Sequence, residues 1–445
     1  MTFQELNLSN PLRNAIDDLG FTTTTLIQER SFPIIMSGKD VIGIAQTGTG
    51  KTFAFLLPSL NQWKFSKEKN PQILIVVPTR ELVAQIVTEI EKLTEYMNVV
   101  TVGVYGGTNI RTQKATLHQG LDVLVATPGR LLDHIYDKSF NPKAIKHLVI
   151  DEVDEMLDLG FRPQLTRILD LLPQKRQNLM FSATMTTEVE KLLMDFFNSP
   201  VKVEAAPTGT PLKNIDQTVY AIPNFNSKVN LVRLLLQNEA MEKVLVFIST
   251  KKQADLLFEL LDPEFPEQIG VIHSNKSQNF RFNVVNNFHS GDLRIVIATD
   301  IVARGIDVSE VSHVINFDIP EVAENYMHRI GRTGRADKKG NAISLCTEKE
   351  LDFKLAIEKL MNHKIEALAL PENLELSTEL IEDEMPKIYM PNVEKKNPVR
   401  RDAGPAFHEK KAKNKKVNNK VRYVDKMKKK YKKPMTKHGK PKKKK

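Results

Sequence analysis

Short apolar runs alternate with helical patterns through the first two hundred positions of the chain. The segment 81–96, for example, repeats apolar residues such as Leu82 and Ile86 at helical spacing. Strands that are apolar throughout and alternate with helices indicate a parallel sheet that is covered on both faces. The predicted strands are Val41–Ile44, Ile73–Val77, Val99–Val104, Asp122–Ala126, Leu148–Ile150 and Leu179–Phe181.

The same alternation restarts after a break in the pattern. The break, Glu204–Lys213, carries Pro207, Gly209 and Pro211 and is typical of a linker. The fold class is therefore α/β, with two tandem parallel-sheet lobes, one ending near residue 205 and one over 214–378. The strands predicted for the second lobe are Val244–Ile248, Gly270–Ile272, Arg294–Ala298, Val311–Phe317 and Ala342–Leu345.

Charge is distributed unevenly along the 445 residues, whose net charge is +10. Residues 387–445 hold 24 Lys and Arg against 4 Asp and Glu, a net of +20, so the remainder carries −10. Large hydrophobic residues are rare in 387–445, which predicts a disordered tail. An acidic body with a basic tail indicates a polyanionic partner, of which nucleic acid is the commonest.

Several classes of protein are excluded by what the chain lacks. The single cysteine, Cys346, excludes a disulfide framework and a cysteine-rich zinc site. The start, Met1–Glu5, has neither the basic residues nor the apolar run of a signal peptide. No segment reaches the ~20 apolar residues of a membrane span. We therefore expect a soluble, cytoplasmic protein with no membrane partner.

A glycine-rich loop follows the first predicted strand and precedes a helical pattern. It reads Ala-Gln-Thr-Gly-Thr-Gly-Lys-Thr over Ala45–Thr52, with alanine where the phosphate-loop consensus has glycine. Glycines let backbone N–H groups surround phosphate oxygens, and the helix N-terminus adds its dipole. Lys51 would reach the β- and γ-phosphates and Thr52 would bind Mg²⁺. The alternative, a loop without function, would not need strand, Gly-Lys-Thr and helix together.

Two adjacent carboxylates, Asp151 and Glu152, follow the apolar strand 147–150. A carboxylate at the end of a strand near a phosphate loop is where the partner of Mg²⁺ belongs. Asp151 would hold the metal through water, and Glu152 would activate the attacking water. Alone, such a pair is more often a solvated helix start, but the phosphate loop in the same lobe favours catalysis.

Eight strings occur in order along the chain: Ala45–Thr52, Pro78–Leu82, Gly106–Gly107, Thr127–Arg130, Asp151–Asp154, Ser182–Thr184, Ala298–Asp307 and Tyr326–Arg335. Taken together, they resemble the motifs of DEAD-box RNA helicases of bacterial type, and the resemblance covers Phe3 to about residue 370. It implies two RecA-like lobes and an RNA helicase with RNA-stimulated ATP hydrolysis, using ATP and Mg²⁺ and binding RNA largely without regard to sequence.

The resemblance also assigns roles to single residues. It implies an adenine-reading element in 1–29, an ATP-binding lobe in 30–205 and a C-terminal helicase lobe in 214–378. Arginine fingers would be Arg332 and Arg335. ATP would be bound by Phe3, Gln28, Ala45, Gln46, Thr47, Gly48, Thr49, Gly50, Lys51, Thr52 and Asp307. Hydrolysis would be coupled to unwinding by Ser182, Thr184, Asp154 and His328. RNA would be contacted by Arg80, Gly107, Thr127, Arg130, Arg281 and Thr299.

The chain departs from the family pattern in two places. Val153 replaces the alanine of Asp-Glu-Ala-Asp, an apolar change that should alter packing only slightly. The adenine-reading element has threonines at Thr22–Thr25 where prolines are usual, although Gln28 and Phe3 are in place. Loop stiffness, and with it the choice of ATP over GTP, is the property that this second departure affects.

Two other functions compete with this interpretation. A DNA helicase of the same superfamily would be distinguished by comparing RNA and DNA as stimulators of ATP hydrolysis. A non-enzymatic RNA-binding scaffold would have lost catalytic residues, whereas Lys51, Asp151, Glu152, Arg332 and Arg335 are all present. The biological setting stays open among ribosome biogenesis, cold adaptation and messenger decay.

Overall fold

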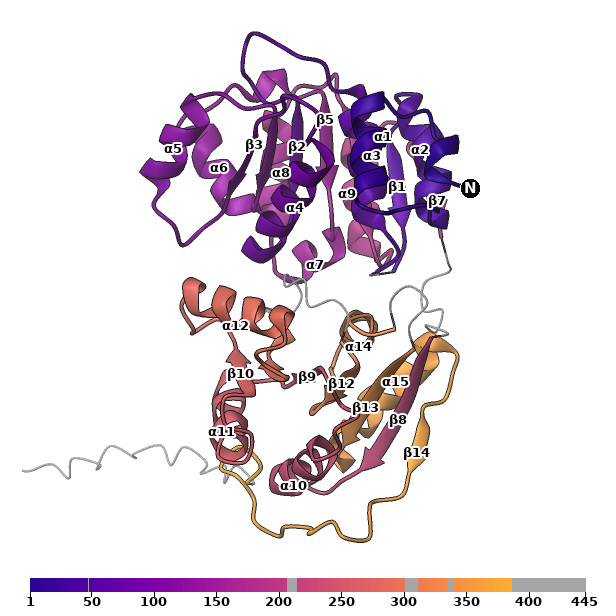
Figure 1. Ribbon diagram of the computed structural model, residues 1–445, viewed down its shortest axis with the longest axis vertical. Helices are drawn as coiled ribbons and strands as arrows, with labels where there is room; N and C mark the ends of the chain where they lie inside the picture. The colour runs from indigo at the N-terminus through magenta and orange to yellow at the C-terminus, as the bar shows by residue number, and fades with distance from the viewer. Residues whose placement is uncertain (47, 206–213, 301–310, 335–338, 386–445) are drawn as a thin grey trace, which may run out of the picture. The chain divides into compact units, whose positions relative to one another are not determined.

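The structure is a computed structural model that describes residues 1–46, 48–205, 214–300, 311–334 and 339–385. Several sequence predictions fall outside these residues: Thr47, Asp307, Arg335, most of the predicted linker and the basic tail 387–445. The described residues form two seven-stranded sheets in which every strand pairing is parallel (Figure 1). The predicted fold class of two tandem parallel-sheet lobes is confirmed.

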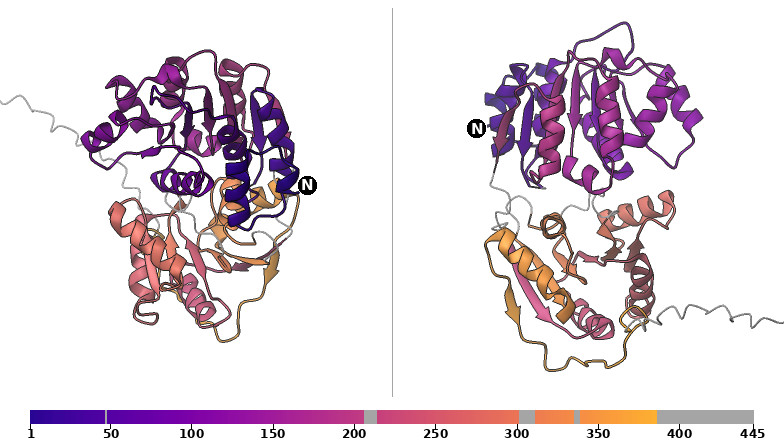
Figure 2. Two further views of the ribbon diagram at one scale, coloured as in Figure 1. Left: turned by 45° about the horizontal axis from the view of Figure 1, so that its top comes forward. Right: turned by 180° about the vertical axis from the view of Figure 1, so that it is seen from behind.

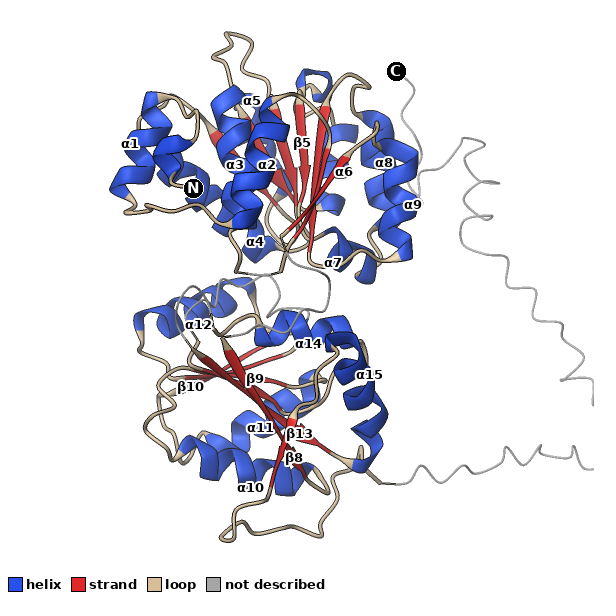
Figure 3. Ribbon diagram, turned by 90° about the vertical axis from the view of Figure 1, so that its right-hand side faces the viewer, coloured by secondary structure: helices blue, strands red, loops and turns tan. Residues whose placement is uncertain are grey.

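The first lobe has strand order β3-β4-β2-β5-β6-β1-β7 and carries helices on both faces of the sheet (Figure 3). Its strands are β1 Val41–Ile44, β2 Ile73–Val76, β3 Thr101–Val104, β4 Val123–Ala126, β5 His147–Ile150, β6 Gln177–Ser182 and β7 Val201–Glu204. Its helices are α1 Asn10–Asp18, α2 Leu26–Met36, α3 Lys51–Gln62, α4 Arg80–Leu93, α5 Ile110–His118, α6 Pro128–Tyr136, α7 Val153–Asp158, α8 Arg162–Leu171 and α9 Thr187–Phe196, with 3-10 turns at Phe3–Glu5 and Pro142–Ala144.

The central strands of this lobe are apolar throughout because both of their faces are buried. Every residue of β1, β2 and β4 is buried. Successive side chains of a strand point to opposite faces, so Val41 packs into the cluster beneath α1–α4 and Ile42 into the cluster beneath α6–α9. The sheet is thus held rigidly between two apolar layers.

The second lobe repeats the strand order of the first, as β10-β11-β9-β12-β13-β8-β14. Its strands are β8 Ile215–Ala221, β9 Val244–Phe247, β10 Ile269–Ile272, β11 Ile295–Ala298, β12 His313–Asn316, β13 Gly340–Cys346 and β14 Glu366–Leu368. Its helices are α10 Phe225–Leu236, α11 Lys251–Leu261, α12 Gln278–Ser290, α14 Ala323–Ile330 and α15 Leu351–Met361, with a 3-10 turn at Glu348–Glu350.

A segment without regular secondary structure, the C-terminal strap (residues 369–385), follows β14 and lies along α10 (Figure 2). Asn230 Nδ2 donates to the Glu375 carbonyl at 2.9 Å and Asn224 Nδ2 to the Ser377 carbonyl at 2.6 Å. Leu374 packs against the apolar core of the lobe. The strap therefore extends the folded part of the chain to its last described residues. Among the helices that the structure describes, none is long and apolar enough to cross a membrane.

Candidate functional site

The predicted site segments of the first lobe all follow carboxyl ends of strands. The segments after β1 to β6 begin near Ala45, Pro78, Gly106, Thr127, Asp151 and Ser182, respectively. Because all these strands are parallel, their carboxyl ends meet at one edge of the sheet. The topology therefore brings together residues that are separated by more than a hundred positions in the sequence.

The phosphate-type loop is shaped by its glycines. Gly48 and Gly50 have φ angles of 78° and 83°, in the left-handed region that side chains rarely adopt. Thr49 Oγ1 donates to the Gln46 carbonyl at 2.7 Å, and the Ala45 N–H donates to the Ser182 carbonyl at 3.1 Å. Helix α3 begins immediately afterwards, so the N-terminus of a 12-residue helix points into the loop.

Lys51 is the first residue of α3 and is 7% exposed. Its ammonium nitrogen is fully covered, yet it makes no hydrogen bond with the described residues. Burying an ammonium group without a partner is costly. An anionic ligand at the loop would satisfy it, so the geometry suits a polyphosphate.

Asp151 and Glu152 lie beside this ammonium group at the end of β5. Burial raises the pKa of Asp151, and the positive charge of Lys51 opposes that rise. Burial raises the pKa of Glu152 to about 8, and the neighbouring carboxylates add to the rise. Glu152 also has a φ angle of 51°, unusual for a residue other than glycine, and its covered Oε2 makes no hydrogen bond to the part of the chain that the structure describes. Such strained and perturbed groups cluster at functional sites.

Asp154 lies one turn further on, in α7, and connects three segments. Its Oδ2 accepts hydrogen bonds from the Thr184 N–H and hydroxyl, both at 2.9 Å, while the Ser182 hydroxyl donates to the Thr184 carbonyl. His328, from α14 of the second lobe, places Nε2 3.9 Å from the same Oδ2. Burial works to raise the pKa of Asp154, but the charges of His328 and Lys51, together with hydrogen bonding, outweigh it and lower the pKa.

Two arginines at the end of α14 have different surroundings. Arg329 is buried and binds both oxygens of Asp300, at 2.6 and 2.7 Å, so it orders the second lobe internally. Arg332 is 6% exposed, and its positive charge acts to lower the pKa of Glu152. Arg332 is thus near enough to influence the carboxylates of the first lobe.

The two aromatic residues of the adenine-reading element have different surroundings. Phe3 is 4% exposed, whereas Phe21 is 47% exposed and meets Phe53 edge-on, with ring centroids 5.3 Å apart. Gln28 Oε1 accepts from the Thr25 N–H at 2.9 Å, and its Nε2 donates to the Gly50 carbonyl at 3.0 Å. The amide therefore lies directly against the phosphate-type loop, and Phe21 presents the exposed ring.

The predicted RNA-contacting residues Arg80 and Arg281 share one polar cluster. Gly107 has a φ of 83°, and a side chain there would collide with the Arg80 guanidinium. Arg80 Nη1 donates to Gln278 Oε1 at 3.2 Å, and Gln278 Nε2 donates to Glu81 Oε1 at 3.0 Å. Arg281 Nη1 lies 2.9 Å from the same Glu81 oxygen. Residues that begin α4 and α12 therefore meet.

The other predicted RNA contacts are positioned by their own loops. Thr127 is the N-cap of α6, and Thr299 is buried, its N–H donating to the Ile272 carbonyl at 3.2 Å. The Arg130 guanidinium donates to Gln113 Oε1 at 2.7 Å and to the Thr108 carbonyl at 3.3 Å. Arg130 thus lies near the carboxyl edge of the first sheet and also holds the segment after β3 through these hydrogen bonds.

Sequence reasoning did not single out Phe21, Glu81, Glu155, Gln278 or Arg329. Glu155 lies directly after the Asp-Glu-Val-Asp string, and its Oε1 is 2.9 Å from His328 Nδ1. The available signal was position: four of these residues lie within or beside a motif already identified, and Gln278 lies three residues before the predicted Arg281. Which of them turn toward a partner depends on the packing of distant segments.

Two family models match the chain: the DEAD/DEAH box helicase domain over residues 25–192 and the helicase conserved C-terminal domain over residues 226–337. The DEAD-box ATP-dependent RNA helicase RhpA of Helicobacter pylori is 39% identical over 370 residues, which are 83% of this chain and 74% of that protein. The DEAD-box ATP-dependent RNA helicase CshA of Geobacillus kaustophilus is 41% identical over 372 residues, 83% of this chain and 79% of CshA.

Solved structures of similar proteins share the arrangement of the chain. Dbp5 of S. cerevisiae, bound to RNA and ADP BeF3, is 29% identical with a TM-score of 0.76, covering 83% of this chain and 95% of that chain. The DEAD-box helicase Mss116, bound to ssRNA and UDP-BeF, is 29% identical with a TM-score of 0.77, covering 84% of this chain and 81% of that chain.

Proposed function

The chain belongs to the DEAD-box family of ATP-dependent RNA helicases, and on this premise we propose how its residues divide the work of ATP hydrolysis and RNA binding. The protein is an RNA helicase with ATPase activity, and it binds RNA. The observation that carries the proposal is the buried Lys51 ammonium group, which lacks a hydrogen-bonding partner among the described residues and lies beside Asp151 and Glu152.

Lys51 binds the β- and γ-phosphates of ATP, together with the backbone N–H groups of Ala45–Thr52. Thr52 and Asp151 would hold Mg²⁺, partly through water. One carboxylate and one hydroxyl suit Mg²⁺, which keeps several waters and binds substrate phosphates rather than an all-protein cage. When bound, the metal neutralises charge on the phosphate oxygens.

Glu152 is the general base for the attacking water. Its raised pKa keeps it protonated until positive charge is added nearby, so the carboxylate forms when the site is complete. Arg332 supplies part of that charge from the second lobe, and we assign the same function to Arg335, which lies outside the described residues. Asp307, also outside them, binds the ribose.

The adenine ring lies against the exposed face of Phe21, with Phe3 supporting the element from within. Gln28 reads the adenine edge while keeping contact with the phosphate-type loop, because its amide nitrogen has a second hydrogen to donate. This arrangement links base recognition to the position of Gly50. Binding GTP against ATP in competition tests how strictly the element selects adenine.

Asp154 couples hydrolysis to RNA binding. It joins Thr184 and Ser182 of the first lobe to His328 of the second, so a change at one carboxylate reaches both lobes. Arg80, Gly107, Thr127, Arg130, Arg281 and Thr299 contact the sugar-phosphate chain. Contacts of this kind are largely independent of base sequence.

A comparison of two substitutions tests this division of roles. Lys51→Ala should weaken ATP affinity as well as turnover, because it removes a contact made in the ground state. Glu152→Gln should lower turnover by roughly 10²–10⁴-fold while ATP and RNA stay bound. Parental turnover by Glu152→Gln would show that the base is misassigned. Stimulation of the parent by single-stranded DNA equally with RNA would favour the DNA-helicase alternative.

The basic segment 387–445 anchors the helicase to RNA near its substrate. It contributes a net charge of +20, and Tyr423 and Tyr431 can stack on bases. The strap that leads to it is tied to α11 by Lys252, 2.8 Å from Glu382. Tethering raises the local RNA concentration without new contacts in the catalytic site.

Deleting residues 387–445 tests this anchor. Each phosphate neutralised adds about −0.7 to the slope of log affinity against log salt for single strands, so deletion should flatten the slope. Turnover at saturating RNA should be unchanged. An unchanged slope would remove the anchor. We also infer action in the cytoplasm, with ribosome biogenesis as one setting, which cell fractionation and sequencing of crosslinked RNA would test.

A further inference from the structure

An exposed aromatic ring lies among the RNA-contacting residues of the second lobe. Phe280 is the third residue of α12 and is 43% exposed. Its N–H donates to the hydroxyl of Ser277, the N-cap residue, at 3.3 Å, so the helix turn that carries it is fixed. The ring packs into none of the apolar clusters formed by the described residues.

A lysine is held against this ring. Lys276 Nζ lies 5.8 Å from the Phe280 ring centroid and 2.9 Å from Asp255 Oδ1. The same Asp255 oxygen lies 2.9 Å from the buried His273 Nε2, which fixes the loop before α12. The lysine is therefore held beside the ring by Asp255, which the buried His273 also contacts, whereas most single exposed apolar side chains have no such setting.

The position of the pair adds a second argument. The residue next to Phe280 is Arg281, and the loop 273–277 follows β10 at the carboxyl edge, where Thr299 follows the neighbouring β11. Lys251, at the start of α11, donates to Asn275 Oδ1 at 3.2 Å and brings another positive charge to this edge. A strand contacted by Arg281 and Thr299 would therefore meet an aromatic ring with a lysine against it, the kind of side-chain pair that proteins use to bind single-stranded nucleic acid.

We propose that Phe280 stacks on one base of the bound RNA strand while Lys276 contacts an adjacent phosphate. This proposal rests on the proposed function, because it extends the RNA-contacting edge by a contact to a base. The other named RNA-contacting residues donate to phosphates or approach the backbone, so Phe280 adds a dependence on bases at one nucleotide. Stacking tolerates every base but favours the larger purine surface.

The experiment combines substitutions in the protein with removal of single bases from the RNA. Binding of a fluorescent ten-nucleotide oligoadenylate is measured with a non-hydrolysable ATP analogue, and each position in turn is replaced by an abasic ribose. For the parent, one abasic position should weaken binding roughly 5- to 150-fold, the range of one base stacked on an aromatic side chain. Phe280→Ala should weaken binding of the intact strand by a similar factor.

The decisive result is whether the two losses coincide. Phe280→Ala should show no further loss at the sensitive position, whereas Phe280→Trp should restore both affinity and sensitivity. Phe65→Ala is the matched control: Phe65 is 72% exposed in the loop before β2, at the opposite edge of the first sheet, and should change nothing.

Two other outcomes have distinct meanings. Phe280→Ala could lower the affinity for the intact strand and for every singly abasic strand by the same factor, or it could leave the affinity unchanged. Either result would overturn the stacking role. Failure of the parent to bind RNA under these conditions would instead contradict the proposed function. Unfolding midpoints of the Phe280 and Phe65 variants, measured by circular dichroism, show whether a loss reflects the fold.

Discussion

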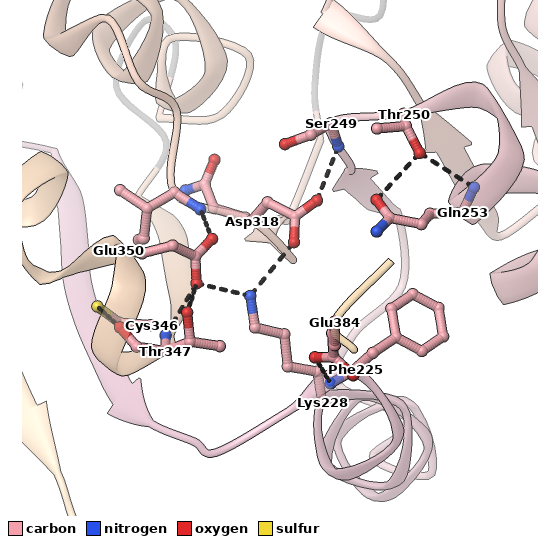
Figure 4. A network of polar contacts seen from close by, with 12 residues as sticks. Phe225, Lys228, Ser249, Thr250, Gln253, Asp318, Cys346, Thr347, Glu350 and Glu384 are labelled. Atoms are coloured by element: carbon pink, nitrogen blue, oxygen red, sulfur yellow. Dashed lines mark hydrogen bonds and ion pairs between the residues drawn. The ribbon is translucent and has the colours of Figure 1, made fainter. Parts of the chain in front are cut away.

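The loop between β1 and α3 and the loop between β8 and α10 hold the same place in their two sheets. The helix after each loop carries a buried lysine, but the two lysines differ in their partners. In the first lobe, Lys51 is buried beside Asp151 without a hydrogen-bonding partner among the described residues. In the second, Lys228 binds Glu350 at 2.9 Å and Asp318 at 3.2 Å (Figure 4). Asp318 follows β12, the counterpart of the strand that precedes Asp151.

The N-terminus of α10 is closed as well. Where α3 offers its first N–H groups to a ligand, the N–H of Phe225 donates to Glu384 Oε1 of the strap at 2.7 Å. In the second lobe, the carboxylate of Glu384 thus occupies the helix N-terminus that α3 leaves to a ligand. Asp318 and Glu350 likewise pair with the buried lysine. The comparison shows that a binding site depends on charges left unsatisfied by the fold, and that a closed network gives stability instead.

The largest effect on turnover should come from the arginines that the second lobe contributes to ATP hydrolysis. Arg332→Ala should reduce RNA-stimulated turnover about 10³-fold or more, the scale of an arginine finger, and Arg335→Ala should behave alike. ATP hydrolysis at saturating RNA measures this. Arg233→Ala, which removes an arginine from α10, is the control. Parental turnover by a folded Arg332→Ala protein would show that the second lobe contributes no charge to the reaction.

The two lysines should separate function from stability. Lys228→Met removes a buried cation from two partly buried carboxylates and should lower the free energy of unfolding by about 3–5 kcal/mol. Lys51→Met should change it by at most about 1 kcal/mol but should weaken ATP binding, as expected of Lys51→Ala. Urea denaturation and nucleotide titration measure both.

Adding Asp318→Asn and Glu350→Gln to Lys228→Met should recover much of the lost stability, because the network is then neutral. If Lys51→Met proved the more destabilising of the two single substitutions, the comparison between open and closed sites would be wrong.

The carboxylate beside the open site should show a pH dependence of intermediate size. Glu152 has its pKa raised from 4.5 to about 8 in the folded protein, so the folded state binds the extra proton between these values. Its contribution to stability is therefore present at low pH and is lost as pH rises toward 8. As pH rises through this window, the free energy of unfolding of Glu152→Gln should increase relative to that of the parent by on the order of 2–4 kcal/mol.

Urea denaturation from pH 5 to 9, without nucleotide and with a chelator, measures that gain. A constant difference between Glu152→Gln and the parent at all pH values would contradict the raised pKa.

The smallest effect should come from the strap. Glu384→Ala removes the carboxylate from the N-terminus of α10 and should cost about 1–2 kcal/mol. Glu379→Ala is matched, because the exposed Glu379 side chain makes no hydrogen bond within the described ranges, while its backbone carbonyl keeps the bond from Asn226. Nucleotide affinity should be parental in both variants. Equal stability of the two would mean that the strap is held by its backbone contacts alone.

Much of the fold was predictable from the periodicity of apolar residues. The strands that were not predicted share one property, the lack of a continuous apolar run. The central strands were predicted because both of their faces are buried, which gives a continuous apolar run. Strands β7, β8 and β14 were not predicted. Strand β8 alternates buried and exposed positions and mixes polar residues among apolar ones. Strands β7 and β14 are short edge strands, and an edge strand need not be apolar throughout.

The chemistry of the site was predictable where spacing along the chain expresses it. Gly48, Gly50 and Lys51 belong to one loop, and Asp151 and Glu152 follow one strand, so their types and order already indicate phosphate and metal binding. The sequence likewise indicated that Asp154 and Thr184 belong together, through the family resemblance, and the structure contains their hydrogen bond.

Tertiary structure alone decided which groups are satisfied and which are left open. Lys51 and Lys228 both lie near the start of a helix after a strand, and only the folded chain places Glu350 against one of them. Phe3 and Phe21 are both aromatic, and packing buries one and exposes the other. The physical reason is that hydrogen bonding, burial and pKa depend on neighbours brought from distant segments, whereas periodicity and loop chemistry are local properties of the chain.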